Sequence, residues 1–105
     1  LLYKGKKETN MEFNIFYEMG HSWIEAKLKD IFKFNVEDEI SSQSRIEGNK
    51  IFLDVDFDAR SFLEKIKSLD PSVKFKIKEN KNLFRSINDK DRYSKELAII
   101  KLSLV

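Results

Sequence analysis

Residues 44–63, SRIEGNKIFLDVDFDARSFL, constrain the fold of this chain more than any other stretch. Gly48-Asn49 is a two-residue turn of the kind that closes a β-hairpin, because these residue types tolerate the positive φ that such turns require. Counting outward from the turn pairs Glu47 with Lys50, Ile46 with Ile51 and Arg45 with Phe52. Opposite charges and apolar side chains then meet across the strands. The stretch therefore predicts a hairpin in one register, followed directly by a helix.

Three aspartates, Asp54, Asp56 and Asp58, alternate where this hairpin ends. An EF-hand is excluded, because the sixth and twelfth loop positions would be an alanine and a lysine instead of glycine and glutamate. A magnesium site formed by Asp54 and Asp56 with Glu12 or Glu18 across the sheet stays open, since alternate residues of a strand share a face. The pattern favours a solvated acidic face, with Asp58 as the cap of the following helix.

Hydrophobic periodicity predicts the remaining elements. Ser22 and Glu25 match a capping box, in which each side chain accepts a hydrogen bond from the free backbone N–H of the other residue. This pattern predicts that a helix follows. The C-terminal run is apolar on both faces, which is typical of a buried strand. The predicted elements are a strand over 11–19, a helix over 23–33, hairpin strands over 40–47 and 50–57, a helix over 59–69, and strands over 73–78 and 96–105.

This order predicts an α+β protein with a ferredoxin-like βαββαβ two-layer sandwich, helices on one face and sheet order 4-1-3-2. The extra C-terminal strand would extend the sheet or pair with another chain. A chain of 105 residues is long enough for one domain with a single core. We therefore expect a single domain over 11–105, preceded by an N-terminal arm at 1–10 that could be non-native, since Leu1 and not Met begins the sequence.

The composition excludes several classes of protein. The chain has no cysteine and one histidine, so disulfides, thiol chemistry and the usual zinc sites are ruled out within one chain. It contains no glycine-rich phosphate loop and no nucleophile oriented by a base and a third group. We therefore expect no catalytic activity and no cofactor. Because no apolar run reaches membrane-spanning length, the expectation is a cytoplasmic protein without a membrane partner.

Charge is unevenly distributed along the chain. Residues 37–64 carry eight acids against three bases, whereas residues 74–95 carry eight bases against three acids. Such a dipolar surface suits a charged partner. The second segment predicts an RNA-binding surface, tRNA being one candidate, in which phosphates are contacted by Lys74, Lys76, Lys78, Lys81 and Arg85.

Two sets of apolar residues are predicted to contact partners. Phe16 and Phe52 fall on the outward face of the two central strands, where aromatic rings can stack on RNA bases. The alternative is that both rings are covered, by a protein partner or by the N-terminal arm, with Phe52 packed on Arg45. Protein contacts, including a homodimer, are predicted for Trp23 at the start of the first helix and for Leu97, Ile99 and Val105 of the terminal strand.

Residues 12–69 resemble the small dimerising subunit of the KEOPS complex, which assists threonylcarbamoyl modification of tRNA adenosine. The likeness lies in FNIFYE followed by a helix and in RIEGNKIFLDVDFDARSFL, which is similar to the hairpin and following helix of that family. The resemblance implies a β-α-β-β-α layout, dimerisation and docking onto a catalytic subunit.

Together these features predict a non-catalytic accessory subunit of an RNA-associated assembly, engaged in tRNA modification or in a ribonucleoprotein. The alternative is a protein-interaction module, such as a small inhibitor or adaptor, that docks through its acidic sheet face or its terminal strand. A metal-dependent nuclease is a third class, and it would need Asp54 and Asp56 to converge with a third acid.

Overall fold

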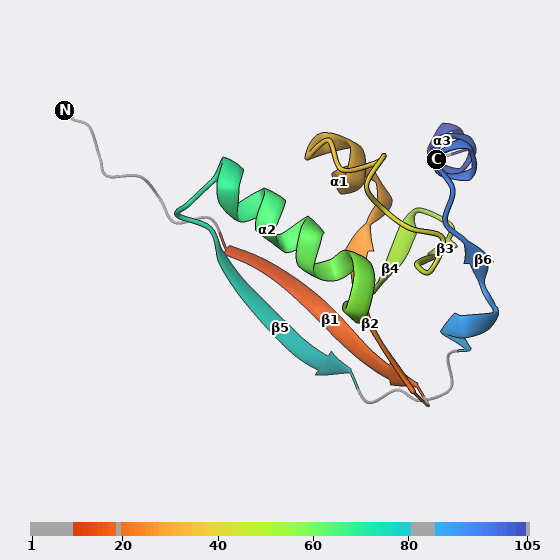
Figure 1. Ribbon diagram of the computed structural model, residues 1–105, viewed down its shortest axis with the longest axis horizontal. Helices are drawn as coiled ribbons and strands as arrows, with labels where there is room; N and C mark the ends of the chain where they lie inside the picture. Colours follow the sequence, from red (N-terminus) through yellow and green to blue (C-terminus); the bar gives the residue numbers. More distant parts are fainter. Residues whose placement is uncertain (1–9, 19, 81–85, 105) are drawn as a thin grey trace.

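The structure is a computed structural model that describes residues 10–18, 20–80 and 86–104. Its elements follow each other as six strands, three α-helices and two short helical turns (Figure 1). They are β1 Asn10–Glu18, β2 His21–Lys27, α1 Leu28–Lys33, β3 Arg45–Glu47, β4 Lys50–Asp54, the π-helical turn η1 Val55–Ala59, α2 Arg60–Leu69, β5 Lys74–Asn80, the 3-10 turn η2 Ile87–Asp89, β6 Asp91–Arg92 and α3 Lys95–Ser103.

The chain is an α+β protein built on one mixed sheet with strand order β5-β1-β2-β4-β3-β6. β1 pairs in parallel with β5, and the other neighbours pair antiparallel. The predicted strand order is interrupted, because β2 lies between β1 and β4. The sheet therefore has more strands than the four of the predicted sandwich, and the additional ones come from segments for which we expected a helix or a connection.

The main core lies between the sheet and the helices, which cover the same face (Figure 1). Alternate residues of the strands point into it, and each helix adds one apolar stripe. Phe62 and Ile66 of α2 are buried, whereas Leu69 is 57% exposed. The fully buried members include Leu28, Ile31, Val36, Ile51, Leu53, Phe62, Val73 and Ala98.

The predicted helix over 23–33 is wrong for its first half. Residues 21–27 form β2, which pairs with β1 through a turn at Gly20, whose φ is +79°. The stretch HSWIEAK alternates as well as it follows a helical period, so both readings were available. Tertiary pairing on both edges of β2 decides for the strand, and Glu25 binds Lys50 of β4 (3.0 Å) instead of closing a capping box. The helix α1 begins only at Leu28.

The predicted C-terminal strand is also wrong, because residues 95–103 form α3. Ser94 begins this helix, and its Oγ accepts a hydrogen bond from the backbone N–H of Leu97 (3.1 Å). A serine cap is a sequence signal for a helix start. A short run that is apolar on all sides satisfies both periods, which explains why periodicity failed here.

The hairpin register is confirmed for the three pairs nearest the turn. The ladder ends there, because β4 stops at Asp54 and the chain turns into η1. The residue that caps this turn is Asp54, whose Oδ1 accepts from the N–H of Asp56 (2.8 Å). The prediction that Asp58 caps the helix is therefore wrong, and Asp58 lies inside the turn with its side chain buried.

Tyr93 joins α3 to the rest of the core and provides a pH test of this packing. Its hydroxyl donates to the carbonyl of Glu37 (2.7 Å), and burial together with the nearby Glu37 and Asp38 charges raises its pKa from 10.0 to about 12. A group whose pKa is higher in the folded state stabilises the fold fully at pH values below its pKa in the unfolded state. This stabilisation is lost as the pH rises through the pKa of the folded state. Tyr93 should therefore lose its contribution, at most about 3 kcal/mol, as the pH rises from about 10 to about 12.

The measurement is chemical denaturation at pH 9, 10, 11 and 12 for the wild type and Tyr93→Phe. Lysines also titrate in this range, so only the difference between the two proteins reports on Tyr93. We expect that difference to shrink as the pH rises. A difference that stays constant across this range would contradict a raised Tyr93 pKa.

Candidate nucleic-acid interface

Three of the predicted phosphate-binding lysines lie together on β5, at one edge of the sheet. The parallel register places Lys74, Lys76 and Lys78 opposite Asn10, Glu12 and Asn14, so all three share the sheet face away from the helices. All three are exposed. We call these three residues the lysine face. Lys81 and Arg85, the other two predicted contacts, lie outside the described residues.

Within the lysine face, Lys76 forms an exposed ion pair with an acid of β1. Lys76 Nζ lies 3.8 Å from Glu12 Oε2, and both side chains are largely in solvent, where such a pair contributes little. Glu79 belongs to the opposite, helix-side face of β5, since its register partner is Ile15. Lysines on an edge strand also oppose pairing with a second β5. The geometry therefore suits an anionic partner and disfavours a dimer through this edge.

The two predicted stacking aromatics are not on an open surface. Phe16 is 3% exposed and Phe52 is 0% exposed, so the chain itself covers both rings. They pack edge to face with centroids 5.8 Å apart. With Trp23 and Ile87 they form a second apolar cluster, separated by the sheet from the main core, which we call the outer cluster. In this conformation neither phenylalanine can stack on a base.

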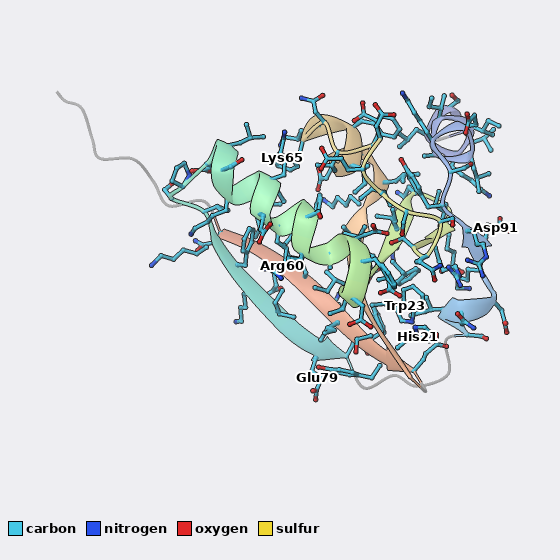
Figure 2. All side chains as sticks on the ribbon, viewed as in Figure 1. His21, Trp23, Arg60, Lys65, Glu79 and Asp91 are labelled. Carbon is cyan, nitrogen blue, oxygen red and sulfur yellow. The ribbon has the colours of Figure 1, made fainter. Side chains whose placement is uncertain are left out.

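Trp23 is completely buried at this site instead of serving as an exposed anchor for a partner (Figure 2). His21 stacks on its ring with centroids 5.5 Å apart, and the Arg45 guanidinium lies 5.3 Å from the ring centroid. Burial, followed by the charge of Arg92, lowers the pKa of Arg45 from its ordinary value. An arginine starts so far above neutral pH that Arg45 stays a cation, and it forms a cation–π contact with Trp23.

One segment, residues 86–92, closes the outer cluster, and we call it the strap. Ile87 is its buried residue, whereas Ser86, Asn88, Asp89, Asp91 and Arg92 are exposed. The Glu18 carboxylate holds the strap, because it accepts from the N–H groups of Ile87 (3.0 Å) and Asn88 (2.9 Å) and from Trp23 Nε1 (3.1 Å). Arg45 donates to the carbonyl and to Oδ1 of Asn88 (3.3 and 3.1 Å).

The aspartates of the sequence do not form the predicted acidic face. Asp54 and Asp58 are each 2% exposed, and only Asp56 is open to solvent. Asp54 Oδ2 lies 3.7 Å from His21 Nδ1, while Asp58 accepts hydrogen bonds from two serines. Within the described part of the chain, no three metal-ligating side chains converge. The internal hydrogen bonds thus account for two of the three carboxylates.

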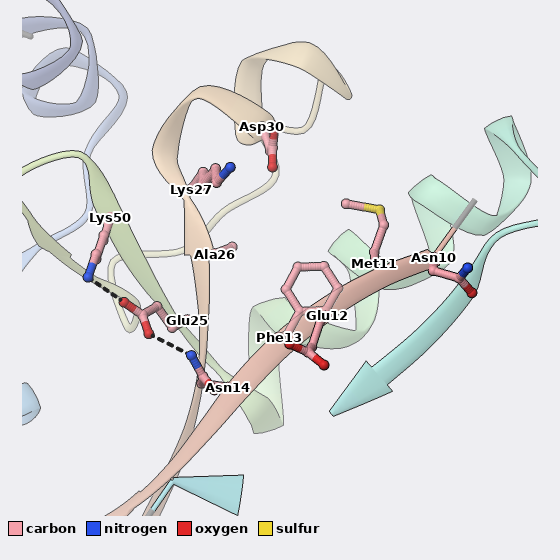
Figure 3. A pocket seen from close by; sticks show the side chains of 10 residues that line it. All are labelled: Asn10, Met11, Glu12, Phe13, Asn14, Glu25, Ala26, Lys27, Asp30 and Lys50. Atoms are coloured by element: carbon pink, nitrogen blue, oxygen red, sulfur yellow. Dashed lines mark hydrogen bonds and ion pairs between the residues drawn. The ribbon is translucent and has the colours of Figure 1, made fainter. Parts of the chain in front are cut away.

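A pocket of about 420 Å³ opens where β1 and β2 diverge (Figure 3). The two strands pair only from Asn14 and Glu25 toward their shared turn, which leaves a gap beyond these residues. The polar groups on its wall bind each other, since Glu25 accepts from Asn14 (3.4 Å) and lies 3.0 Å from Lys50 Nζ. We therefore assign no ligand to this pocket. Its lining is Asn10, Met11, Glu12, Phe13, Asn14, Glu25, Ala26, Lys27, Asp30 and Lys50.

Two of the residues predicted for a protein interface, Leu97 and Ile99, lie on different sides of α3. Leu97 packs against the main core, whereas Ile99 is 48% exposed. Val105 lies outside the described residues. Ile100 and Leu104, which were not singled out, are 56% and 78% exposed, so α3 presents a second apolar side to solvent.

Sequence reasoning missed that Glu18 and Arg45 hold the strap. A carboxylate at the end of a strand carries no sequence signal for a hydrogen bond to a segment nearly seventy positions away. For Arg45 a weak signal existed, because the predicted hairpin register already placed it beside Phe52.

In comparisons with protein-family models, curated protein sequences and solved structures, nothing matches this chain. Across the described residues, every helix is too short or too polar to traverse a lipid bilayer.

Proposed function

We propose that this chain is a non-catalytic accessory subunit of an RNA-associated assembly and that it contacts RNA phosphates through the lysine face. The observation that carries the proposal is the alignment of Lys74, Lys76 and Lys78 on one exposed side of an edge strand. Their spacing along β5 is about 7 Å, which is close to the distance between successive phosphates of an extended strand. Electrostatic contacts of this kind supply most sequence-independent affinity for nucleic acids.

The topology is compatible with the expected fold family when the strands are renumbered. We infer that β2-α1-β3-β4-α2-β5 is a ferredoxin-like βαββαβ unit into which β1 is inserted, between its first and last strands. The resemblance of residues 12–69 to the small KEOPS subunit supports tRNA modification as the assembly type. Fold analogy alone does not define a function, so the binding test below decides.

Replacing two lysines of the lysine face should weaken RNA binding. We expect Lys76→Gln/Lys78→Gln to reduce the affinity for a single-stranded RNA roughly tenfold at low salt, because fewer counterions are released. The slope of log affinity against log salt should become shallower by about 1 to 1.5. Fluorescence anisotropy with labelled RNA at several salt concentrations measures both quantities.

The matched control is Lys29→Gln/Lys33→Gln, which makes the same charge change at two exposed lysines of α1. This control should bind RNA nearly as well as the wild type. Equal losses in the two double variants would show that net charge, and not the lysine face, sets the affinity. Unchanged affinity in Lys76→Gln/Lys78→Gln would contradict the proposal.

The second candidate is a protein-interaction module, and the outer side of α3 favours it. Ile99, Ile100 and Leu104 expose apolar surface that a second copy of the chain could cover. Light scattering with and without bulk tRNA separates the two functions. A dimer that Ile100→Glu converts to a monomer, without any tRNA-dependent shift, would favour this module over the RNA-binding subunit.

A further inference from the structure

We propose that the outer cluster is a base-stacking site for single-stranded nucleic acid that the strap closes, so that binding requires the strap to leave the sheet. This inference rests on the proposed function and adds a second, aromatic contact to it. Three aromatic side chains from the adjacent strands β1, β2 and β4 meet under the strap, and they are Phe16, Trp23 and Phe52. Stacking on aromatic rings is how proteins hold unpaired bases without reading their sequence.

The lysine face and the outer cluster are continuous on one face of the sheet. The parallel register places Lys78 beside Asn14 and Asn80 beside Phe16. On the other side of β1, Phe16 is the Cα partner of Trp23. A strand of RNA whose phosphates follow the lysines would therefore bring its bases toward these rings. Binding of this type combines a basic track with stacking platforms.

The contacts that hold the strap are of a kind that can break without unfolding the domain. Ile87 is its buried residue in the outer cluster, and the other attachments are polar. Between described residues they include the Glu18 and Arg45 bonds, the Lys90–Glu47 pair (2.7 Å), the bond from Arg92 to the Ser42 carbonyl (3.2 Å) and the short β6 ladder. Water solvates the freed groups on opening, so the net cost of losing each bond is well below its strength in the absence of solvent. Segments with few buried apolar contacts open at lower free energy than the core.

The main core does not depend on the strap. Its cluster contains residues of all three α-helices and lies on the opposite face of the sheet. Opening the strap therefore exposes the outer cluster, whereas the α2 residues of the main core lie on the other face of the sheet. The apparent affinity for RNA is then the affinity of the open state multiplied by the fraction of molecules in which the strap is open.

A reversible lock tests this inference. The chain has no cysteine, so Glu47→Cys/Lys90→Cys introduces the sole thiol pair, at the two positions that follow the Ile46–Asp91 pair in the β3–β6 register. The oxidised form ties the strap to β3, and the reduced form of the same protein is its own control for charge and composition. Disulfide formation is verified by mass and thiol titration.

Two readouts on a short single-stranded RNA report different contacts. Anisotropy gives the affinity, and fluorescence of Trp23, which is the single tryptophan, reports base stacking through quenching. We expect the oxidised form to bind at least about fivefold more weakly than the reduced form, which is the low end for one stacked base. Quenching should vanish on oxidation while the salt slope stays the same, because the lysine face is unchanged.

Equal affinity and equal quenching in both redox states would overturn the closed-site inference and leave the lysine face intact. A wild-type chain that does not bind RNA at all would overturn the proposed function and this inference with it. If the cysteine variant does not fold, Ile87→Ser provides a second test. Its Trp23 emission should shift to longer wavelength and its RNA affinity should rise several-fold; unchanged or weaker binding would overturn the inference.

Discussion

Phe62→Ala should lower the free energy of unfolding by about 3 to 5 kcal/mol. Phe62 is 0% exposed at the centre of the α2 stripe. Its ring meets Phe13 edge to face at 6.0 Å between centroids and Phe34 in the same way at 6.2 Å. Truncation removes the ring's burial, deletes two aromatic contacts and leaves a cavity that rigid neighbours fill only partly. Urea denaturation, monitored by circular dichroism, measures this loss of stability.

The matched control is Phe57→Ala, which removes the same ring five residues earlier from a side chain that is 59% exposed. A change within about 0.5 kcal/mol is expected there. Because a loss of 5 kcal/mol could unfold a domain of ordinary stability, Phe62→Leu supplies a milder variant that should cost clearly less. Similar losses for Phe62→Ala and Phe57→Ala would contradict the packing of α2 on the sheet.

Asp58→Ala should be the second most damaging change, with a loss of about 2 to 4 kcal/mol. The Asp58 carboxylate is 2% exposed and accepts three hydrogen bonds. The donors are the Ser41 backbone N–H (3.0 Å), Ser41 Oγ (2.8 Å) and Ser44 Oγ (2.6 Å). These bonds tie the loop before β3 to the turn before α2. Alanine would leave the donors without their acceptor, which costs more than the bonds themselves contribute.

Two further variants separate the hydrogen bonds from the charge. Asp58→Asn keeps one acceptor oxygen and should be intermediate. Asp56→Ala removes a neighbouring exposed carboxylate and should change stability by less than about 0.5 kcal/mol. The same denaturation series serves for all of them. If Asp58→Ala were as mild as Asp56→Ala, the buried serine–carboxylate cluster would not be a stabilising feature.

Local patterns with one interpretation were predicted correctly. The turn at Gly48-Asn49 determines the pairing of its flanking residues, and the structure has the same pairs. The helix over 59–69 was also predicted, and the structure has α2 over Arg60–Leu69, beyond which Pro71 disfavours continuation.

Local patterns with two interpretations were decided by distant partners. Residues 21–27 became a strand because β1 and β4 offer hydrogen bonds on both sides. Residues 95–103 became a helix because Ser94 caps its first turn and because the helix packs against α1. Periodicity alone could not choose between strand and helix for these short segments, although Ser94 was a local signal for the helix over 95–103.

The candidate site shows the same division. Alternation along β5 was enough to place Lys74, Lys76 and Lys78 on one face, and alternation along β1 and β4 was enough to place Phe16 and Phe52 on the face away from the main core. The covering of those rings involves Ile87, which Glu18 and Arg45 help to hold in place, and these three residues come from separate parts of the chain.

The sequence by itself determined the α+β class, the hairpin, α2 and the alignment of the β5 lysines. These features follow from patterns among residues that are close together in the sequence. Only the tertiary structure decided the order of the sheet, the fate of the aspartates and the closure of the outer cluster. Those features depend on contacts between residues far apart in the chain, and a contact of that kind forms only after several elements have already packed together.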